Sequence, residues 1–164
     1  MTTLFARTLG AVLIAVTGSC ASGVGGPASS NPVLPNALVG EFADDYGIEY
    51  TITSNEWFQR PGARYHIVRA DTTARYLVAR NDDRNPGDGG LWTRIDWIVL
   101  EGMPPYEWAF CLSAYDAPTM AAAEAVTHAR RDTPRTGCNG HPFSRMRRRA
   151  PTSAVDPLVA PRAE

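Results

Sequence analysis

The amino-acid sequence predicts a mainly β protein: an antiparallel meander that forms a small barrel or a sandwich, with one helix near the C-terminus. Two observations carry this prediction. Six or seven segments between residues 38 and 115 alternate apolar with polar side chains, or are rich in aromatic and β-branched residues. One alanine-rich segment follows them. Consecutive strands before a single helix are typical of a sheet that closes, or nearly closes, on itself.

The predicted strands follow one another through short connections. Asp45 and Tyr46 separate the first two strands as a hairpin turn, Pro61-Gly62 marks a later turn, and residues 81–90 form a loop by composition. In the last two strands, alternate residues point to opposite faces of the sheet. The predicted strands cover residues 38–44, 47–53, 56–59, 65–71, 75–81, 91–100 and 106–115.

The only predicted helix runs from about Pro118 to Arg131. Asp116 can cap its N-terminus. Pro118 suits the first turn, because backbone N–H groups there have no acceptor within the helix and proline, which lacks an N–H, is tolerated. Alanines fill its interior, and His128 and Arg130 lie near the negative end of the helix dipole.

The first strand begins with Gly40-Glu41-Phe42, which is similar to the Gly-x-Trp motif of the lipocalin or calycin class, with Phe42 in place of the Trp. The late helix, and a cysteine that ties the segment after it to the barrel, add to the resemblance. It covers most of residues 38–141. The resemblance implies a cup that holds a small apolar ligand.

The N-terminal residues have the three parts of a secretory signal. One positive residue, Arg7, precedes an apolar run from Leu9 to Val16, and small residues follow. The run is too short to span a hydrocarbon core, which needs roughly 20 residues. The segment before Cys20 resembles the lipobox of bacterial lipoproteins, with Thr17 where the usual form has Leu.

The lipobox resemblance implies that Cys20 is lipidated and becomes the mature N-terminus. The alternatives are an ordinary signal peptide, cleaved around Ala21 to Gly23 and followed by secretion, and an uncleaved N-terminal anchor. We therefore divide the chain into a signal peptide (1–19), a lipidated cysteine and flexible tether (20–36), a single β-rich domain (37–144) and a disordered basic, Pro-rich tail (145–164).

The number of cysteines agrees with lipidation. The chain has three cysteines, and if Cys20 carries lipid, Cys111 and Cys138 remain as a pair. An exported chain meets an oxidising compartment, in which disulfides persist. We expect a Cys111–Cys138 disulfide, with two unpaired thiols as the alternative.

Four residues of the last two strands are candidates for ligand binding: Trp92, Arg94, Asp96 and Trp108. Arg94 and Asp96 share a face, so they would either orient a polar ligand head in a cavity or be weakly coupled neighbours at the surface. The tryptophans would line a pocket or fill the core.

Catalytic and metal-binding patterns are poor. His66, His128 and His141 lack metal-ligand spacing, and no cofactor or metal is expected. Asp44 and Asp45 precede Gly47, which is ordinary turn chemistry, although they could also form an acid/base pair.

The sequence predicts a lipid-anchored protein of the cell envelope that acts as a binding or structural module. Its partners would be the membrane, through the N-terminal lipid, and a small apolar ligand or an envelope protein. The formal net charge of −1 provides no broad field to attract nucleic acid. The alternative is an extracytoplasmic hydrolase or isomerase that uses Asp44, Asp45 or His141.

Overall fold

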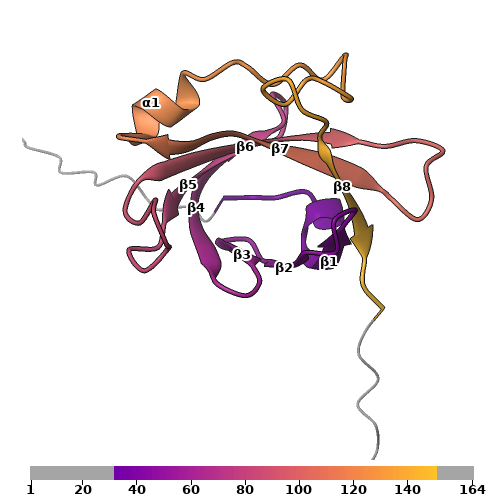
Figure 1. The fold of residues 1–164 in the computed structure, drawn as a ribbon, viewed down its shortest axis with the longest axis horizontal. Coiled ribbons are helices and arrows are strands. Elements are labelled where there is room, and N and C mark those ends of the chain that lie inside the picture. Colours follow the sequence, from indigo (N-terminus) through magenta and orange to yellow (C-terminus); the bar gives the residue numbers. More distant parts are fainter. Residues whose placement is uncertain (1–31, 151–164) are drawn as a thin grey trace, which may run out of the picture.

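The structure, a computed structural model, describes residues 32–150 and contains a closed barrel of eight antiparallel strands (Figure 1). Each strand pairs with the next along the chain, and β8 also pairs with β1. Of the two predicted forms, the barrel is the one observed. The strands are β1 (Gly40–Asp44), β2 (Glu49–Ile52), β3 (Glu56–Gln59), β4 (Ala63–Asp71), β5 (Tyr76–Asn81), β6 (Trp92–Val99), β7 (Trp108–Ala117) and β8 (Ser144–Arg148).

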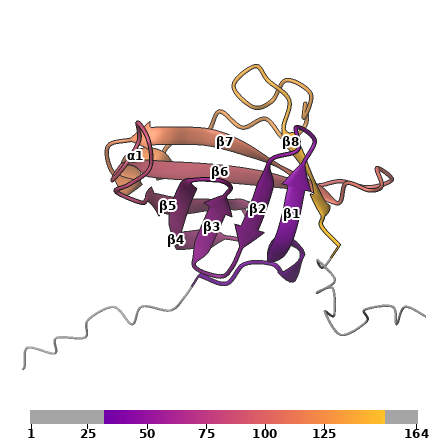
Figure 2. The same ribbon diagram turned by 60° about the horizontal axis from the view of Figure 1, so that its bottom comes forward.

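The seven predicted strands are all present, with small shifts at their ends. Their order in the sequence is their order around the barrel, so β1, β2 and β3 lie side by side and β8 lies next to β1 (Figure 2). The turns between them use the expected residues. Gly47 has a φ of 85°, a backbone conformation that glycine adopts readily.

The prediction of a disordered tail from residue 145 is wrong at its start. Ser144–Arg148 forms β8, which pairs with both β7 and β1 and so closes the barrel. Met146 is fully buried in the core, whereas Arg147 points outward. A five-residue strand with a single buried apolar side chain has no visible alternation, so sequence patterning missed it. Residues 151–164 lie outside the described residues, as do 1–31.

One end of the barrel, here called the closed end, is covered by the chain that leads into β1. A short 3₁₀ helix, η1 (Asn36–Leu38), lies across it, and Leu34 and Leu38 are buried in the core. Arg148 of β8 donates to the backbone carbonyl of Val39 at 3.2 Å, and its guanidinium carbon lies 5.0 Å from the centre of the Phe42 ring. The predicted flexible tether therefore ends earlier than expected, because residues 34–36 belong to the folded domain.

Aromatic side chains fill the interior. Edge-to-face contacts at centroid distances between 5.1 and 5.9 Å join rings from β1, β2, β3 and β7. Such contacts stabilise by about 0.5–1.5 kcal/mol each beyond the burial of area. These rings pack the middle of the barrel. The end opposite the closed end is here called the mouth. The rings belong to Phe42, Tyr50, Trp57, Trp108 and Phe110.

The chain between β7 and β8 covers the outer wall of the barrel (Figure 1). It contains α1 (Met120–Glu124), capped by the Thr119 side chain, which accepts from the Ala122 N–H at 3.1 Å. The predicted helix exists but is shorter, and its cap is Thr119 instead of Asp116. Beyond the helix, Arg131 donates to the backbone carbonyls of Trp97 at 3.3 Å and of Ala74 at 2.7 Å. No helix within residues 32–150 has the length and apolar character needed to cross a membrane.

Candidate functional site

A pocket of about 580 Å³ opens at the mouth of the barrel, where β7 extends beyond its partner. The last pair between β7 and β8 is Phe110 with Ser144, and β7 then continues to Ala117. The part of β7 beyond Phe110 therefore has no β8 partner, and a gap remains between it and the turn that joins β1 to β2. The volume falls in the range of roughly 300–1,000 Å³ that is typical of small-molecule sites. We call this cavity the mouth pocket.

The walls of the mouth pocket are largely apolar and aromatic. Ile48, Phe110 and Leu112 line them, and two tyrosines stand at the rim: Tyr46 is 70% exposed and Tyr115 is 55% exposed. Polar side chains complete the lining: Asp44, Gln59, Asn139, His141 and Ser144. An apolar cavity with a few polar groups is the usual form of a small-molecule site.

Asp44 and Tyr50 provide the most deeply buried polar groups of the pocket. Asp44 is 3% exposed, and one of its oxygens, Oδ2, accepts a hydrogen bond from the Tyr50 hydroxyl at 2.9 Å. Burial, together with the charge of Asp44, raises the pKa of Tyr50. The hydroxyl of Tyr50 therefore stays protonated and donates to the carboxylate.

The turn between β1 and β2 fixes the Asp44 carboxylate. Its other oxygen, Oδ1, accepts from the backbone N–H of Tyr46 at 2.9 Å and of Ile48 at 2.8 Å. This is the turn chemistry expected from the sequence, since aspartate side chains bond to backbone groups a few residues ahead. The same contacts that form the hairpin therefore hold a carboxylate at the pocket.

The predicted disulfide between Cys111 and Cys138 is confirmed, with an S–S distance of 2.05 Å. It joins β7 to the segment that returns toward β8, and both cysteines line the mouth pocket. His141 lies in the same segment, in which the Cys138 N–H donates to the His141 carbonyl at 2.9 Å. The disulfide therefore helps to define one side of the pocket.

The four predicted ligand-binding residues are not brought together. Trp108 is 1% exposed in the interior, and its indole N–H has no hydrogen-bond partner among the described residues. Trp92 packs on the outside of the barrel, in the apolar cluster between α1 and the barrel wall. None of the four lines the mouth pocket. A contact of these residues with a ligand stays a prediction, and the geometry favours a different place.

Arg94 and Asp96 lie in neither of the two expected environments. They are 7% and 1% exposed on the outer face of β6, beneath the chain between β7 and β8, so the expectation of a surface pair is wrong. Asp96 accepts from Arg94 Nε at 2.8 Å, from Arg131 at 2.5 Å and from the Ser113 hydroxyl. Arg94 also donates to the Glu124 carbonyl at 2.6 Å. This ion cluster fastens the covering chain to the barrel wall.

The candidate catalytic residues do not form a catalytic arrangement among the described residues. Asp44 and His141 both line the mouth pocket, but no side-chain hydrogen bond joins them. Asp45 turns away and binds Arg145 at 2.9 Å. Within residues 32–150, no group of three or more His, Cys, Asp or Glu side chains is placed to hold a metal ion.

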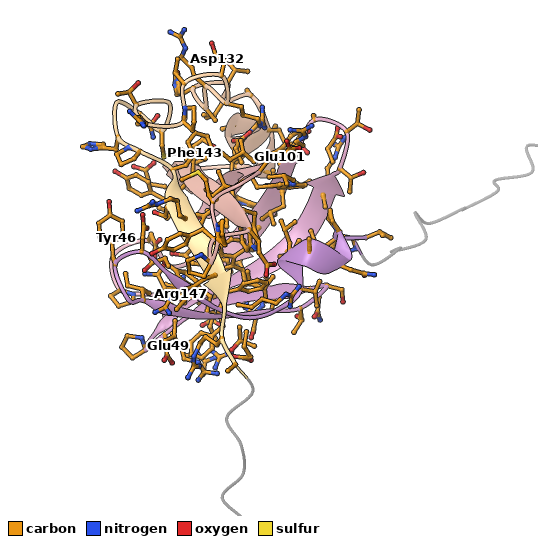
Figure 3. The ribbon with its side chains drawn as sticks, turned by 90° about the vertical axis from the view of Figure 1, so that its right-hand side faces the viewer. Tyr46, Glu49, Glu101, Asp132, Phe143 and Arg147 are labelled. Atoms are coloured by element: carbon orange, nitrogen blue, oxygen red, sulfur yellow. A yellow bond between two sulfur atoms is a disulfide. The ribbon has the colours of Figure 1, made fainter. Side chains whose placement is uncertain are left out.

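A second cavity, of about 520 Å³, lies on the outer wall near β8, and Tyr46 and Pro142 line both this cavity and the mouth pocket. In Figure 3 the chain descends from Phe143 to Arg147 along β8, with Tyr46 beside it. Ile98, Leu100 and Phe143 make this outer groove apolar.

No family model, curated protein or solved structure matches the chain significantly. The functional interpretation therefore rests on the geometry of the barrel and of its mouth.

Proposed function

We propose that this protein is a binding module of the cell envelope, held at the membrane by lipid on Cys20, whose barrel mouth takes up a small and largely apolar ligand. The observation that carries the proposal is the mouth pocket, because it combines ligand-sized volume, apolar walls and a buried polar group. The lipobox-like sequence before Cys20 supports the location.

Binding is favoured over the alternative of a hydrolase or isomerase. A general acid or base must be within hydrogen-bond reach of the group it serves, and a paired acid and base must be placed on either side of one reacting atom. The Asp44 carboxylate instead accepts three hydrogen bonds that hold the turn and Tyr50. These contacts suit a fixed recognition group better than a proton carrier.

Native mass spectrometry of the purified full-length protein tests the binding function. We expect a retained small molecule, or binding of an apolar fluorescent probe that Leu112→Trp weakens at least tenfold by filling the pocket. Val99→Trp is the matched control, since Val99 is 60% exposed at the other end of the wall. An empty protein that binds no apolar probe would contradict the proposal.

The anchoring part has its own test. Replacing Cys20 with Ser should move the protein from the membrane fraction to the aqueous fraction, because the anchoring acyl chains could no longer be attached. The control is a double variant that replaces Cys111 and Cys138, which should stay in the membrane fraction because it keeps Cys20. Membrane association that persists in Cys20→Ser would contradict lipid anchoring.

A further inference from the structure

We infer that the mouth pocket selects a small organic cation, an amine or quaternary ammonium group carried on an apolar body. This inference rests on the proposed binding function and names the ligand class of the same site. Three independent features of the pocket support it: its charge, the direction of its hydrogen bonds and its aromatic lining.

The charge of the lining is negative. Asp44 is the only acidic residue among those described around the pocket, and none is an arginine, although the chain contains 16 Lys and Arg residues in total. Within residues 32–150, no arginine comes within 4 Å of the Asp44 carboxylate. A carboxylate this deeply buried normally has a cationic partner. A ligand that carries positive charge would supply the missing partner.

The hydrogen bonds around Asp44 and Tyr50, at the base of the pocket, use the donors that face the carboxylate and leave acceptors. The hydroxyl proton of Tyr50 is committed to Asp44, so the phenol oxygen is left to accept. The backbone N–H groups of Tyr46 and Ile48 are also committed to Asp44. A ligand head that donates hydrogen bonds fits this surface, whereas a carboxylate or phosphate would face another acceptor and a like charge.

The aromatic lining suits a cation. Tyr46, Tyr50, Phe110 and Tyr115 contribute rings to the pocket. Elsewhere in the barrel, arginines already lie over aromatic rings, as Arg94 does over Tyr76 at 3.9 Å. Among the described residues, no arginine lies over the four rings of the pocket. Ring faces attract cations by about 0.5–2 kcal/mol, most strongly where water is excluded.

Three probes with one aromatic body and different head groups test the inference: 2-phenylethylamine, 2-phenylethanol and 3-phenylpropionate. Calorimetric titration of the full-length protein at pH 7 should show the amine binding at least about tenfold more tightly than the alcohol, as expected for one added charge interaction of about 1.4 kcal/mol. The carboxylate should not bind measurably. Asp44→Asn should remove the preference for the amine while the alcohol still binds.

Asp132→Asn is the matched control, because it makes the same chemical change on an exposed carboxylate far from Tyr46 (Figure 3). If Asp44→Asn does not fold, Tyr50→Phe and the comparison of the three probes on the unmodified protein still decide the question. Equal binding of amine and alcohol, tighter binding of the carboxylate, or an amine preference that survives in Asp44→Asn would overturn the inference. None of these results affects the binding function, which falls only if the protein is empty and binds no apolar probe.

Discussion

The closed end and the mouth of the barrel differ in what satisfies their polar groups. At the closed end, Arg148 pairs with backbone carbonyls of the chain around η1 and covers the ring of Phe42, so the charge of the arginine is used within the protein. At the mouth, the Asp44 carboxylate is buried with hydrogen bonds but without a cation among the described residues. The difference supports the proposal that the mouth, and not the closed end, receives an external partner.

The largest effect should come from the core at the closed end. Trp108→Ala removes a ring that contacts Phe42, Trp57 and Phe110, and should lower the free energy of unfolding by about 3–5 kcal/mol. Tyr115→Ala at the mouth should change it by less than about 0.5 kcal/mol, because that side chain is exposed. Urea denaturation followed by circular dichroism measures both, and similar losses would remove the distinction between the two ends.

The ion cluster on the outer wall should rank next. Asp96→Ala leaves Arg94 buried without its carboxylate partner and releases Arg131, which should cost about 3 kcal/mol or more. Asp132→Ala, at an exposed position, should cost less than about 0.5 kcal/mol. Hydrogen exchange should also increase in the segment between β7 and β8. A change in stability below 1 kcal/mol would show that the cluster does not fasten this segment.

The disulfide should matter mainly at the mouth. The double variant Cys111→Ala and Cys138→Ala opens a loop with a sequence separation of 27 residues, which should lower the free energy of unfolding by about 2–4 kcal/mol. Ligand affinity should fall as well, because both cysteines line the mouth pocket. Reduction of the unmodified protein should reproduce both effects. Unchanged affinity after reduction would mean that the pocket keeps its shape without the bond.

Removing the arginine of the closed end should have a smaller effect. Arg148→Ala loses the contact with Phe42 and the hydrogen bonds to the carbonyls of Asn36 and Val39, which should cost about 1–2 kcal/mol. Arg147→Ala is the control, since its side chain is exposed on the same strand. Thermal unfolding compares the two variants, and ligand binding should be retained in both. Equal stability of the two variants would contradict the assigned role.

The smallest effect should be a loss of stability at alkaline pH. Burial raises the pKa of Tyr65 to about 12, and the pKa of Tyr50 is raised as well, whereas an unfolded chain ionises tyrosine near 10. Between these values the folded state holds more protons than the unfolded state, so stability falls as pH rises from about 10. Stability should be constant from pH 8 to 9. Tyr50→Phe should flatten the alkaline decline, and an unaltered decline would contradict burial of this phenol.

Much of the fold could be predicted from local patterns. The turn at Asp44 to Gly47, the alternation in β6 and β7, and the pairing of Cys111 with Cys138 depend on short-range preferences or on the number of cysteines. The candidate site was predictable only in part. Asp44 and His141 could be identified from the sequence as titratable groups. Ile48 and Leu112 could not, because nothing in the sequence distinguishes an apolar residue of a pocket wall from one of the core.

The sequence by itself determined that this chain is a β meander followed by one helix, because strand alternation, turn chemistry and helix capping act over a few residues. The number of cysteines predicted the disulfide. Only the tertiary structure decided which face of each strand is inside. Alternation along a strand defines two faces, but it does not show which face is buried. It also decided that residues 144–148 close the barrel, and that Arg94 and Asp96 lie under a covering segment. The mouth pocket exists because β1, β2, β7 and the end of the covering segment converge. Its lining residues are up to 100 positions apart in the chain, as Asp44 and Ser144 are.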